Sequence, residues 1–347
     1  MQKTAWYKRF LRDKAGPLLI LLIVLMLITM AISSGIFEGG KKFSALFTEG
    51  MMASGNLLQI FYNLVIQTIM MCGLALILIG GNIDLSVGAQ ATLSTMIFAL
   101  LLSKTNIPWP VLILLCLVIA ACCGLITTFL VNVLQFPAFI ATIGMSSIYT
   151  GLCKVLTAGN NVQIVATKAQ AYIDIGKASI AGRIPWIFVF AIALLIIYQC
   201  VLSFTTFGRG IYMSGGNPNA ARLSGLNPNK IRMALFVNNS VLAAVGGLLW
   251  TAQVKQANPT AISSNGYDMN VISASILGGV SFMGGAGHLG GAFVALLLLN
   301  VFDNMLKVLR VPDYWTIFAS GFLLAVALMI DYISAERRKK KLLESKL

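Results

Sequence analysis

SGGNPNAARLSGLNPNK, residues 214–230, is a polar stretch that lies between two long apolar segments. Gly216 breaks the preceding structure, and Asn217 can cap a short helix through its side-chain oxygen. Residues 220–224 suffice for about one and a half helical turns, after which Gly225 ends the helix. The stretch therefore predicts a short helix on the membrane surface, between two spanning helices, where another protein can contact it. An ordinary cytoplasmic loop is the alternative interpretation.

The composition of the chain is that of an integral membrane protein. Of its 347 residues, 58% are hydrophobic and 10% are charged, and the mean hydropathy is +0.86. Soluble domains are about 25% charged, so most of this chain belongs in lipid. The formal net charge is +14. Because the basic residues cluster at the ends of apolar segments, this charge indicates membrane topology and contact with anionic headgroups, not nucleic-acid binding.

The cysteine and histidine content argues against a metal centre or a disulfide framework. All six cysteines lie within or beside apolar runs, and none forms a Cys-x-x-Cys pair. The single histidine, His288, excludes a multi-histidine metal site. No catalytic histidine–carboxylate cluster is indicated, so we expect no catalytic residues and no bound metal. The cysteines are Cys72, Cys116, Cys122, Cys123, Cys153 and Cys200.

Apolar runs predict an all-α polytopic membrane protein with about ten transmembrane helices in a single membrane domain, residues 1–347. The first run follows a basic N-terminus, as in a signal peptide. It is longer than a usual signal-peptide core and lacks a good cleavage site, so we interpret it as an uncleaved span. The expected spans are residues 17–34, 57–79, 86–103, 109–134, 138–157, 185–204, 232–252, 267–282, 288–306 and 314–333.

The distribution of basic residues sets the expected orientation. With both termini inside, 15 of the 25 lysines and arginines lie on the cytoplasmic side, when Arg232 at the start of the seventh span is counted with them. Basic segments at both ends of the chain also require an even number of spans. The expected cytoplasmic segments are 1–16, 207–231 and 334–347, the external loops are 158–184 and 253–266, and the transmembrane domain is 17–333.

Two stretches interrupt the apolar pattern with glycines. IGGNIDLSVG, residues 79–88, places a carboxylate among glycines between the second and third spans. LGGVSFMGGAG, residues 277–287, lies between the eighth and ninth spans. Non-helical backbone at membrane depth is tolerated only against protein or a water-filled path. Both stretches should therefore face the interior of the protein.

Asp84 is the one acidic residue near the membrane interior in the first half of the chain. An ionisable group in the membrane is costly enough to indicate a functional role. The alternative is that Asp84 caps the start of the third span by accepting backbone N–H bonds. The two roles are compatible.

Side-chain amides recur in the expected spans. Asn63 and Gln67 share one helix face because they are four residues apart. Amides suit a neutral, hydroxyl-rich solute because each can donate and accept hydrogen bonds, although bonding between helices explains them equally well. The candidate residues of a translocation path are Asn63, Gln67, Asn82, Asp84, Asn238, Asn239 and Asn300.

Two short matches to nucleotide-binding motifs carry little weight in this context. Residues 285–290 match Gly-x-Gly-x-x-Gly, but a dinucleotide site needs a preceding strand and a βαβ unit. Between membrane spans, packing of small residues explains the pattern better. Residues 223–225 resemble the start of an ATPase signature, from which residues 226–227 depart. No Gly-x-x-x-x-Gly-Lys-Ser/Thr motif occurs, so the chain has no recognisable means of holding ATP.

Three of these stretches together resemble the permease subunit of a sugar-type ABC importer, the ribose, galactose and autoinducer-2 group. Residues 80–88 resemble that family's GG-x-DLSVG signature, with one extra residue. Residues 215–227 resemble its ATPase-coupling loop, and residues 277–287 resemble its third signature. The similarity covers about residues 57–333. The coupling residues that it implies are Gly216, Asn217, Ala220, Ala221, Arg222, Leu223, Ser224, Gly225, Leu226 and Asn227.

The resemblance also implies the surroundings of the chain. It implies a multi-pass protein of the bacterial cell membrane that forms a dimer with a second permease copy or a homologous permease. Two cytoplasmic ATPases and an extracytoplasmic solute-binding protein would be its partners. The solute would be a monosaccharide or a similar polar molecule, moved inward by alternating access. ATP and Mg²⁺ would bind to the partner subunits, so this chain would hold no cofactor and would not be an enzyme.

The coupling stretch should present a small apolar face to its partner. If residues 216–229 form a docking helix, the face should comprise Ala220, Leu223 and Leu226. Ala221 and Gly225 are small enough to enter a groove of the ATPase. Burial of one leucine supplies about 1.5–3 kcal/mol, enough for one such contact to decide docking.

Two alternative functions remain open. Branched-chain amino acid permeases are related and share the ARLSGLN-like loop, although a zwitterionic solute would require a compensating charge in the membrane. A secondary carrier driven by an ion gradient would use paired intramembrane charges or broken helices. The chain has glycine-broken segments but only one deep carboxylate.

Overall fold

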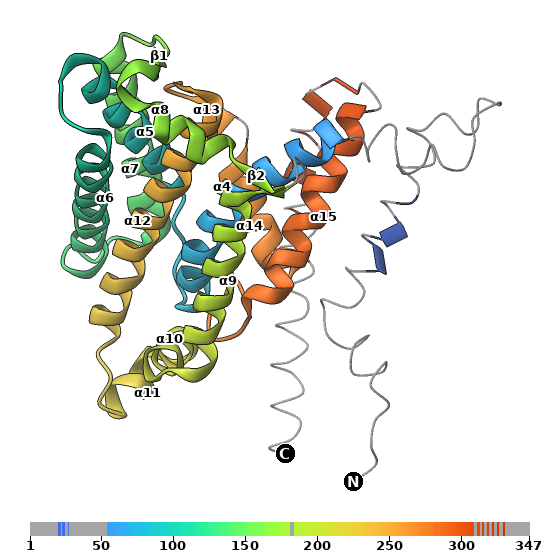
Figure 1. Cartoon of the computed structure of the whole chain (residues 1–347). Coiled ribbons are helices and arrows are strands. Elements are labelled where there is room, and N and C mark those ends of the chain that lie inside the picture. The colour runs from blue at the N-terminus through green and yellow to red at the C-terminus, as the bar shows by residue number, and fades with distance from the viewer. Residues whose placement is uncertain are drawn as a thin grey trace.

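The computed structural model describes residues 54–180, 184–264 and 266–308, together with single positions outside these ranges. Within them, seven helices are long and apolar enough to cross a membrane (Figure 1). These are α4 (Ser54–Ile79), α5 (Val87–Lys104), α6 (Trp109–Asn132), α7 (Ala138–Thr157), α9 (Trp186–Phe204), α12 (Pro228–Val254) and α15 (Leu289–Val308). The shorter helices are α8 (Ala166–Lys177), α10 (Thr206–Gly216), α11 (Pro218–Leu223), α13 (Ala261–Ser264) and α14 (Tyr267–Leu277).

Four two-residue strands complete the secondary structure of the described residues. They form two antiparallel ladders, in which β1 (Val162–Gln163) pairs with β4 (Gln256–Ala257) and β2 (Ser179–Ile180) pairs with β3 (Ile184–Pro185). Apart from these ladders, the described protein is helical, as the sequence predicts.

The apolar runs predict most helix boundaries to within a few residues. The predicted span 138–157 coincides with α7, and 232–252 lies inside the longer α12. The predicted span 267–282 is wrong, because α14 ends at Leu277 after 11 residues and a glycine-rich segment follows. The predicted spans 17–34 and 314–333 lie largely outside the described residues, so the total of about ten spans stays a prediction.

Helix α4 is the centre of the fold. Its residues 64–79 are all buried, and α9, α12, α14 and α15 pack around it. Helix α12 contacts α4 and also α5 and α6, so it joins two hydrophobic clusters. One cluster surrounds α4, and the other lies between α5, α6, α7 and α8.

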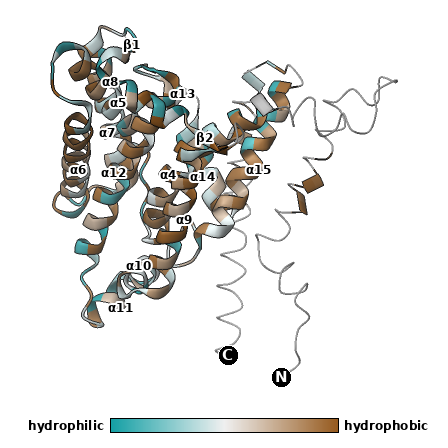
Figure 2. Ribbon diagram, in the orientation of Figure 1, coloured by the Kyte–Doolittle hydropathy of each residue, from teal (hydrophilic) through white to brown (hydrophobic). Residues whose placement is uncertain are grey.

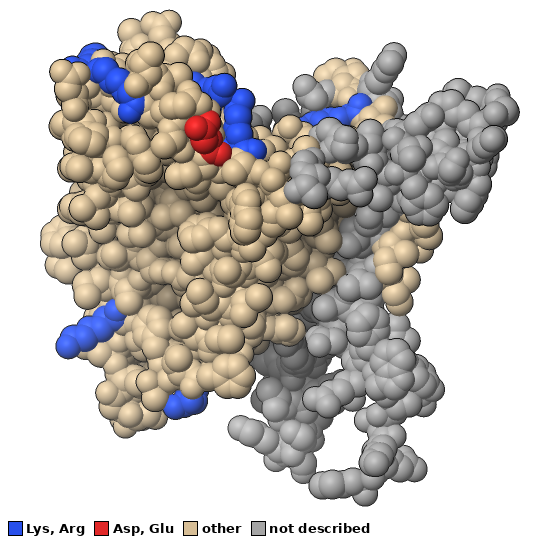
Figure 3. Space-filling view, viewed as in Figure 1, with Lys and Arg blue, Asp and Glu red and all other residues tan. Residues whose placement is uncertain are grey.

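The outward faces of the bundle are apolar where lipid is expected. Helix α6 exposes Leu114 and Val118, and α9 exposes Ile196 and Ile197. Figure 2 shows hydrophobic residues along the length of these helices. On the face shown in Figure 3, the charged side chains of the described residues lie toward the two ends of the bundle, with an uncharged band between them. This distribution fits a multi-pass membrane protein.

Short elements cap the two ends of the bundle. β1, α8 and α13 lie at one end, and α10 and α11 lie at the other (Figure 1). The predicted external loops contribute to the first end, where pairing of β1 with β4 joins them. The predicted cytoplasmic segment 207–231 forms the second end. Which end faces the cytoplasm stays a prediction.

Candidate coupling segment and polar path

Helix α11 occupies the stretch in which the sequence predicts a short helix, and α10 ends just before it. The predicted cap is confirmed, since Asn217 Oδ1 accepts hydrogen bonds from the backbone N–H groups of Asn219 (3.1 Å) and Ala220 (3.0 Å). Gly225, with φ +80°, ends the turn after α11 in the left-handed conformation. Asn227 caps the start of α12 in the same way as Asn217 caps α11. Helix α10 was not predicted.

The exposed tip of this segment differs in detail from the expected docking face. Leu223 is 91% exposed, so it offers an apolar side chain to a partner. Ala221 is fully buried within the chain, and Leu226 is half-buried and lies near Gly210 of α10. Ala221 therefore packs against the bundle and cannot enter a groove of a partner, whereas Leu226 is partly accessible. The other candidate coupling residues, all exposed, are Gly216, Asn217, Ala220, Arg222, Ser224, Gly225 and Asn227.

Three glycine pairs from distant parts of the chain meet at one point, which we call the glycine junction. The backbone N–H of Gly285 donates a hydrogen bond to the carbonyl oxygen of Ile79 (2.7 Å). A Cβ atom on Gly215 would lie 1.9 Å from this oxygen, and one on Gly284 would lie 2.7 Å from the Cα of Gly81. Only glycine lets the three backbones approach so closely. The pairs are Gly80-Gly81 after α4, Gly215-Gly216 at the end of α10 and Gly284-Gly285 before α15.

Side chains of α9 and α10 also hold the second glycine-broken stretch. The Tyr212 hydroxyl donates to the carbonyl oxygen of Gly287 (2.6 Å). Gln199 Oε1 accepts a hydrogen bond from the backbone N–H of Leu289 at the start of α15 (2.8 Å). The coupling segment and both glycine-broken stretches therefore form one contiguous unit, and a displacement of α10 would reach the end of α4 and the start of α15.

Asp84 is fully buried between α4 and α5. Its Oδ1 accepts hydrogen bonds from the backbone N–H (2.8 Å) and the hydroxyl (2.6 Å) of Ser86. Its Oδ2 accepts a hydrogen bond from Nδ2 of Asn239 on α12 (2.8 Å). Ser86, not Asp84, is the residue that immediately precedes α5. Asp84 thus fixes the turn that leads into α5 and joins this turn to α12.

Two of the candidate path residues, Asn82 and Asn238, make other contacts. Asn82 Nδ2 donates to the carbonyl oxygen of Gly80 (2.9 Å), a hydrogen bond within the turn after α4. Asn238 accepts a hydrogen bond from the Tyr198 hydroxyl at a mostly apolar cavity between α4, α9 and α12. These contacts stabilise the turn and the helix packing.

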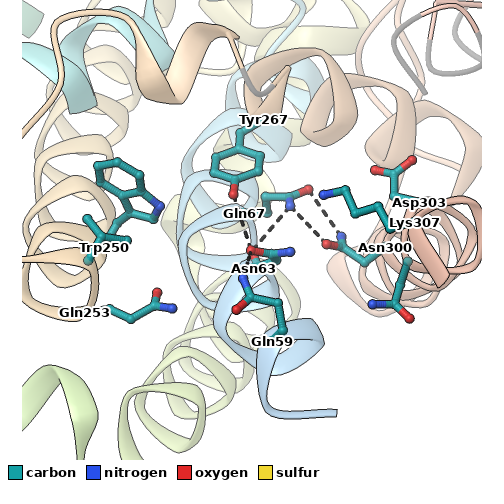
Figure 4. A pocket seen from close by; sticks show the side chains of 11 residues that line it. Gln59, Asn63, Gln67, Trp250, Gln253, Tyr267, Asn300, Asp303 and Lys307 are labelled. Atoms are coloured by element: carbon teal, nitrogen blue, oxygen red, sulfur yellow. Dashed lines mark hydrogen bonds between the residues drawn. The ribbon is translucent and has the colours of Figure 1, made fainter. Parts of the chain in front are cut away.

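Asn63, Gln67 and Asn300 meet at a polar cavity of about 310 Å³ (Figure 4). Gln67 and Asn300 exchange two hydrogen bonds, from Nε2 to Oδ1 (3.0 Å) and from Nδ2 to Oε1 (3.2 Å), and thereby join α4 to α15. Asn63 Oδ1 accepts hydrogen bonds from the Tyr267 hydroxyl (3.3 Å) and from Gln59 Nε2 (3.2 Å). Helix α15 also contributes Asp303, Asn304 and Lys307, and α12 contributes Trp250, Gln253 and Val254.

The polar cavity and the glycine junction lie at opposite ends of the same helices. The cavity uses the first half of α4, the start of α14 and the last turns of α12 and α15. The junction includes the end of α4 and the segment before α15. The start of α12 lies at this same end of the bundle, beside α11. The long helices α4 and α15 therefore connect the two places.

Comparison with known proteins identifies the family. The family described as "Branched-chain amino acid transport system / permease component" matches residues 56–328, which include the coupling segment, both glycine-broken stretches and the polar cavity. The chain belongs to this permease family. The motifs quoted from the sequence therefore predicted the family correctly.

Similar permeases come from sugar and autoinducer import systems. This permease is 31% identical over 277 residues to the ribose import permease protein RbsC of Escherichia coli (strain K12), which covers 80% of this chain and 85% of the relative. RbsC of Haemophilus influenzae is also 31% identical, over 80% of this chain and 84% of the relative. The autoinducer 2 import system permease protein LsrC of Photorhabdus luminescens is 31% identical, over 78% and 80%. No solved structure matches the chain.

Proposed function

We propose that this permease is the transmembrane subunit of an ABC importer and forms the translocation path for a monosaccharide or a similar polar solute. An extracytoplasmic binding protein delivers the solute. Two cytoplasmic ATPases bind ATP and Mg²⁺, and a second permease, identical or homologous, completes the path. Both termini and α11 face the cytoplasm. The ribose and autoinducer 2 permeases among the relatives support this assignment.

The glycine junction is the observation that carries this proposal. An ABC permease needs an exposed segment that the ATPases can move and a physical link from this segment to the path. Helix α11 supplies the exposed segment, with Leu223 at its tip. The junction and the hydrogen bond from Tyr212 to Gly287 link it to the ends of α4 and α15. These two helices also line the polar cavity.

The contacts at the junction support a simple mechanism. ATP binding brings the ATPases together and shifts α10 and α11 against the bundle. Because the three backbones touch at the junction, a shift of α10 toward the bundle displaces the end of α4 and the segment before α15. The hydrogen bond from Tyr212 to Gly287 also joins α10 to that segment. Helices α4 and α15 carry Gln67 and Asn300, so the same shift changes the separation of these amides and opens or closes the cavity.

Solute uptake, measured once with an ATPase inhibitor and once with a protonophore, tests this function. Radiolabelled D-ribose and D-galactose serve as solutes, because relatives include ribose permeases. Uptake should stop with orthovanadate, which inhibits ABC ATPases. It should continue with a protonophore when the ATP concentration is held constant. Uptake that stops with the protonophore and resists vanadate would contradict the proposal and favour an ion-coupled carrier.

A branched-chain amino acid permease is the second candidate, because the family description names that transport system. Asp303 and Lys307 at the cavity could pair with the ammonium and carboxylate groups of an amino acid. Val254, however, is the one aliphatic residue that lines the cavity, so apart from the flat face of Trp250 a branched side chain finds no apolar pocket there. An excess of L-leucine should therefore leave sugar uptake unchanged.

A further inference from the structure

The polar cavity gathers more polar groups than the hydrogen bonds between its helices account for, since Trp250, Gln253 and Lys307 also line it. Its lining comes from α4, α12, α14 and α15, which bury mainly apolar residues elsewhere. Every lining residue except Val254 carries a polar group. Polar side chains are costly within the membrane and mark solute pathways there. The cavity therefore has the chemistry of a binding site for a hydrophilic solute.

The amides of the cavity are paired in a way that sugar hydroxyl groups can replace. Gln67 and Asn300 exchange two hydrogen bonds, and Asn56 and Asn304 do the same one helical turn farther along α15 (2.9 and 2.8 Å). Each amide both donates and accepts, as does each sugar hydroxyl. A sugar can therefore exchange with these amide–amide bonds without leaving a buried polar group unpaired.

Trp250 supplies a different kind of wall. Figure 4 shows its indole ring on the side of the cavity away from Asn300, with Asn63 between them in the view. An indole presents a large apolar face, which complements the C–H face of a sugar ring. The hydroxyl groups at the edge of that ring would then be directed to the amides. An apolar wall combined with a few placed polar groups is the usual design of a small-molecule site.

Size and charge restrict the ligand further. A volume of about 310 Å³ holds about ten water molecules at about 30 Å³ each, which suits one monosaccharide better than a disaccharide. Asp303 and Lys307 are four residues apart on α15, so their charges offset each other. Asn270 Nδ2 also donates a hydrogen bond to Asp303 Oδ2 (3.3 Å). The cavity therefore does not require a charged ligand.

We propose that this cavity is where the permease receives its solute, and that the solute binds as a single monosaccharide ring. The ring stacks on Trp250, and its hydroxyl groups bind Gln67 and Asn300. Tyr267 holds Asn63 in place at the side of the site. This assignment rests on the proposed function, for which it names the binding site and the size of the solute.

Equilibrium dialysis with the full-length permease in nanodiscs tests the assignment. The radiolabelled probes are D-ribose, D-galactose, maltose and L-leucine. At least one of the two monosaccharides should bind, and maltose and L-leucine should not. Trp250→Ala should weaken monosaccharide binding at least about tenfold. Trp186→Ala is the matched control, because this side chain is 56% exposed on α9 and lies outside the cavity, so binding should not change.

Further variants separate loss of the site from loss of the fold. Trp250→Phe keeps an aromatic wall and should retain binding, whereas Gln67→Leu keeps a similar volume without the amide and should lose it. Wild-type affinity in Trp250→Ala, binding of L-leucine or maltose, or no monosaccharide binding by the wild type would each overturn the assignment. Gly290→Ala lies outside the cavity and its Cβ would meet no atom within 4 Å, so it should bind sugar normally. Energy-dependent uptake, measured as above, tests the proposed function separately.

Discussion

Asp84 joins two elements through one buried carboxylate. It accepts hydrogen bonds from Ser86, in the turn before α5, and from Asn239 on α12. Oδ1 of Asn239 is buried and has no hydrogen-bond partner in the described part of the chain. This free acceptor determines which replacements of Asp84 the site can tolerate.

Asp84→Asn should retain much of the uptake, whereas Asp84→Ala should lose it. The asparagine oxygen can accept the hydrogen bonds of Ser86, and a turn of the Asn239 amide lets its Oδ1 accept the new donor, so one Asn239–Asp84 bond is replaced by another. Alanine would remove the acceptor of Ser86 as well as that of Asn239 and leave several buried donors unpaired, at a cost of about 1–3 kcal/mol each. Uptake per permease molecule in the membrane measures the difference. Complete loss of uptake in both variants would show that the negative charge of Asp84 is required. Wild-type uptake by Asp84→Ala would show that uptake needs neither the charge nor the hydrogen bonds of this residue.

Gly225→Arg should leave the spans inserted and abolish ATP-driven uptake. Gly225 is exposed near Arg222, so arginine adds bulk and a like charge where the ATPase is expected to dock. The backbone φ of +80° also strains most side chains, by about 1–2 kcal/mol. Gly225→Asn is the matched control, because asparagine tolerates this conformation, and it should keep most of the uptake. If Gly225→Arg retains both solute-stimulated ATP hydrolysis and uptake, α11 is not the docking element.

At the scale of the elements, close packing of α14 on α15 depends on glycine. A Cβ on Gly278 would lie 2.4 Å from the Cα of Ala292. Gly278→Ala should therefore destabilise the purified permease by about 1–3 kcal/mol, as overpacked interiors do. Gly290→Ala should not, because a Cβ there meets no atom within 4 Å. Thermal unfolding midpoints compare the two, and equal midpoints would contradict this packing.

The sequence predicted the long helices because each is an apolar run of about membrane length. The span predicted at α14 was too long. Residues 278–282 continue the apolar run of the sequence, but two glycines end the helix at Leu277. It missed α10 because TFGRGIYMSGG contains four glycines and has a low helix propensity. Burial of Ile211, which depends on the fold, and the local cap by Thr205 hold this helix.

The candidate site was predictable only in part, because it too depends on how the helices pack. Spacing places Asn63 and Gln67 on one face, but their meeting with Asn300 depends on how α4 packs against α15. Trp250 and Tyr267 carried no signal, because aromatic residues are common near helix ends in membrane proteins. Each glycine pair was recognisable as a break, yet only the fold brings the three pairs into contact.

At the scale of the whole molecule, α8 and α11 lie at opposite ends of the bundle (Figure 1). Gln170 and Ala220 are exposed at these two ends. In a permease whose native cysteines have been replaced, Gln170→Cys should react with a membrane-impermeant maleimide in intact cells. Ala220→Cys should react only after the membrane is opened. The reverse pattern would place α11 outside, where no ATPase can reach it.

The most direct test of coupling through the glycine junction is uptake by Gly215→Ala. The measurement uses proteoliposomes that contain the permease with its ATPases and binding protein, and it compares Gly215→Ala with Gly290→Ala. A Cβ on Gly215 would lie 1.9 Å from the carbonyl oxygen of Ile79, so the three backbones must separate. We predict that Gly215→Ala assembles with the ATPases but transports at least about tenfold more slowly, while Gly290→Ala transports normally. Wild-type uptake by an assembled Gly215→Ala complex would contradict the claim that α11 drives the path through this junction.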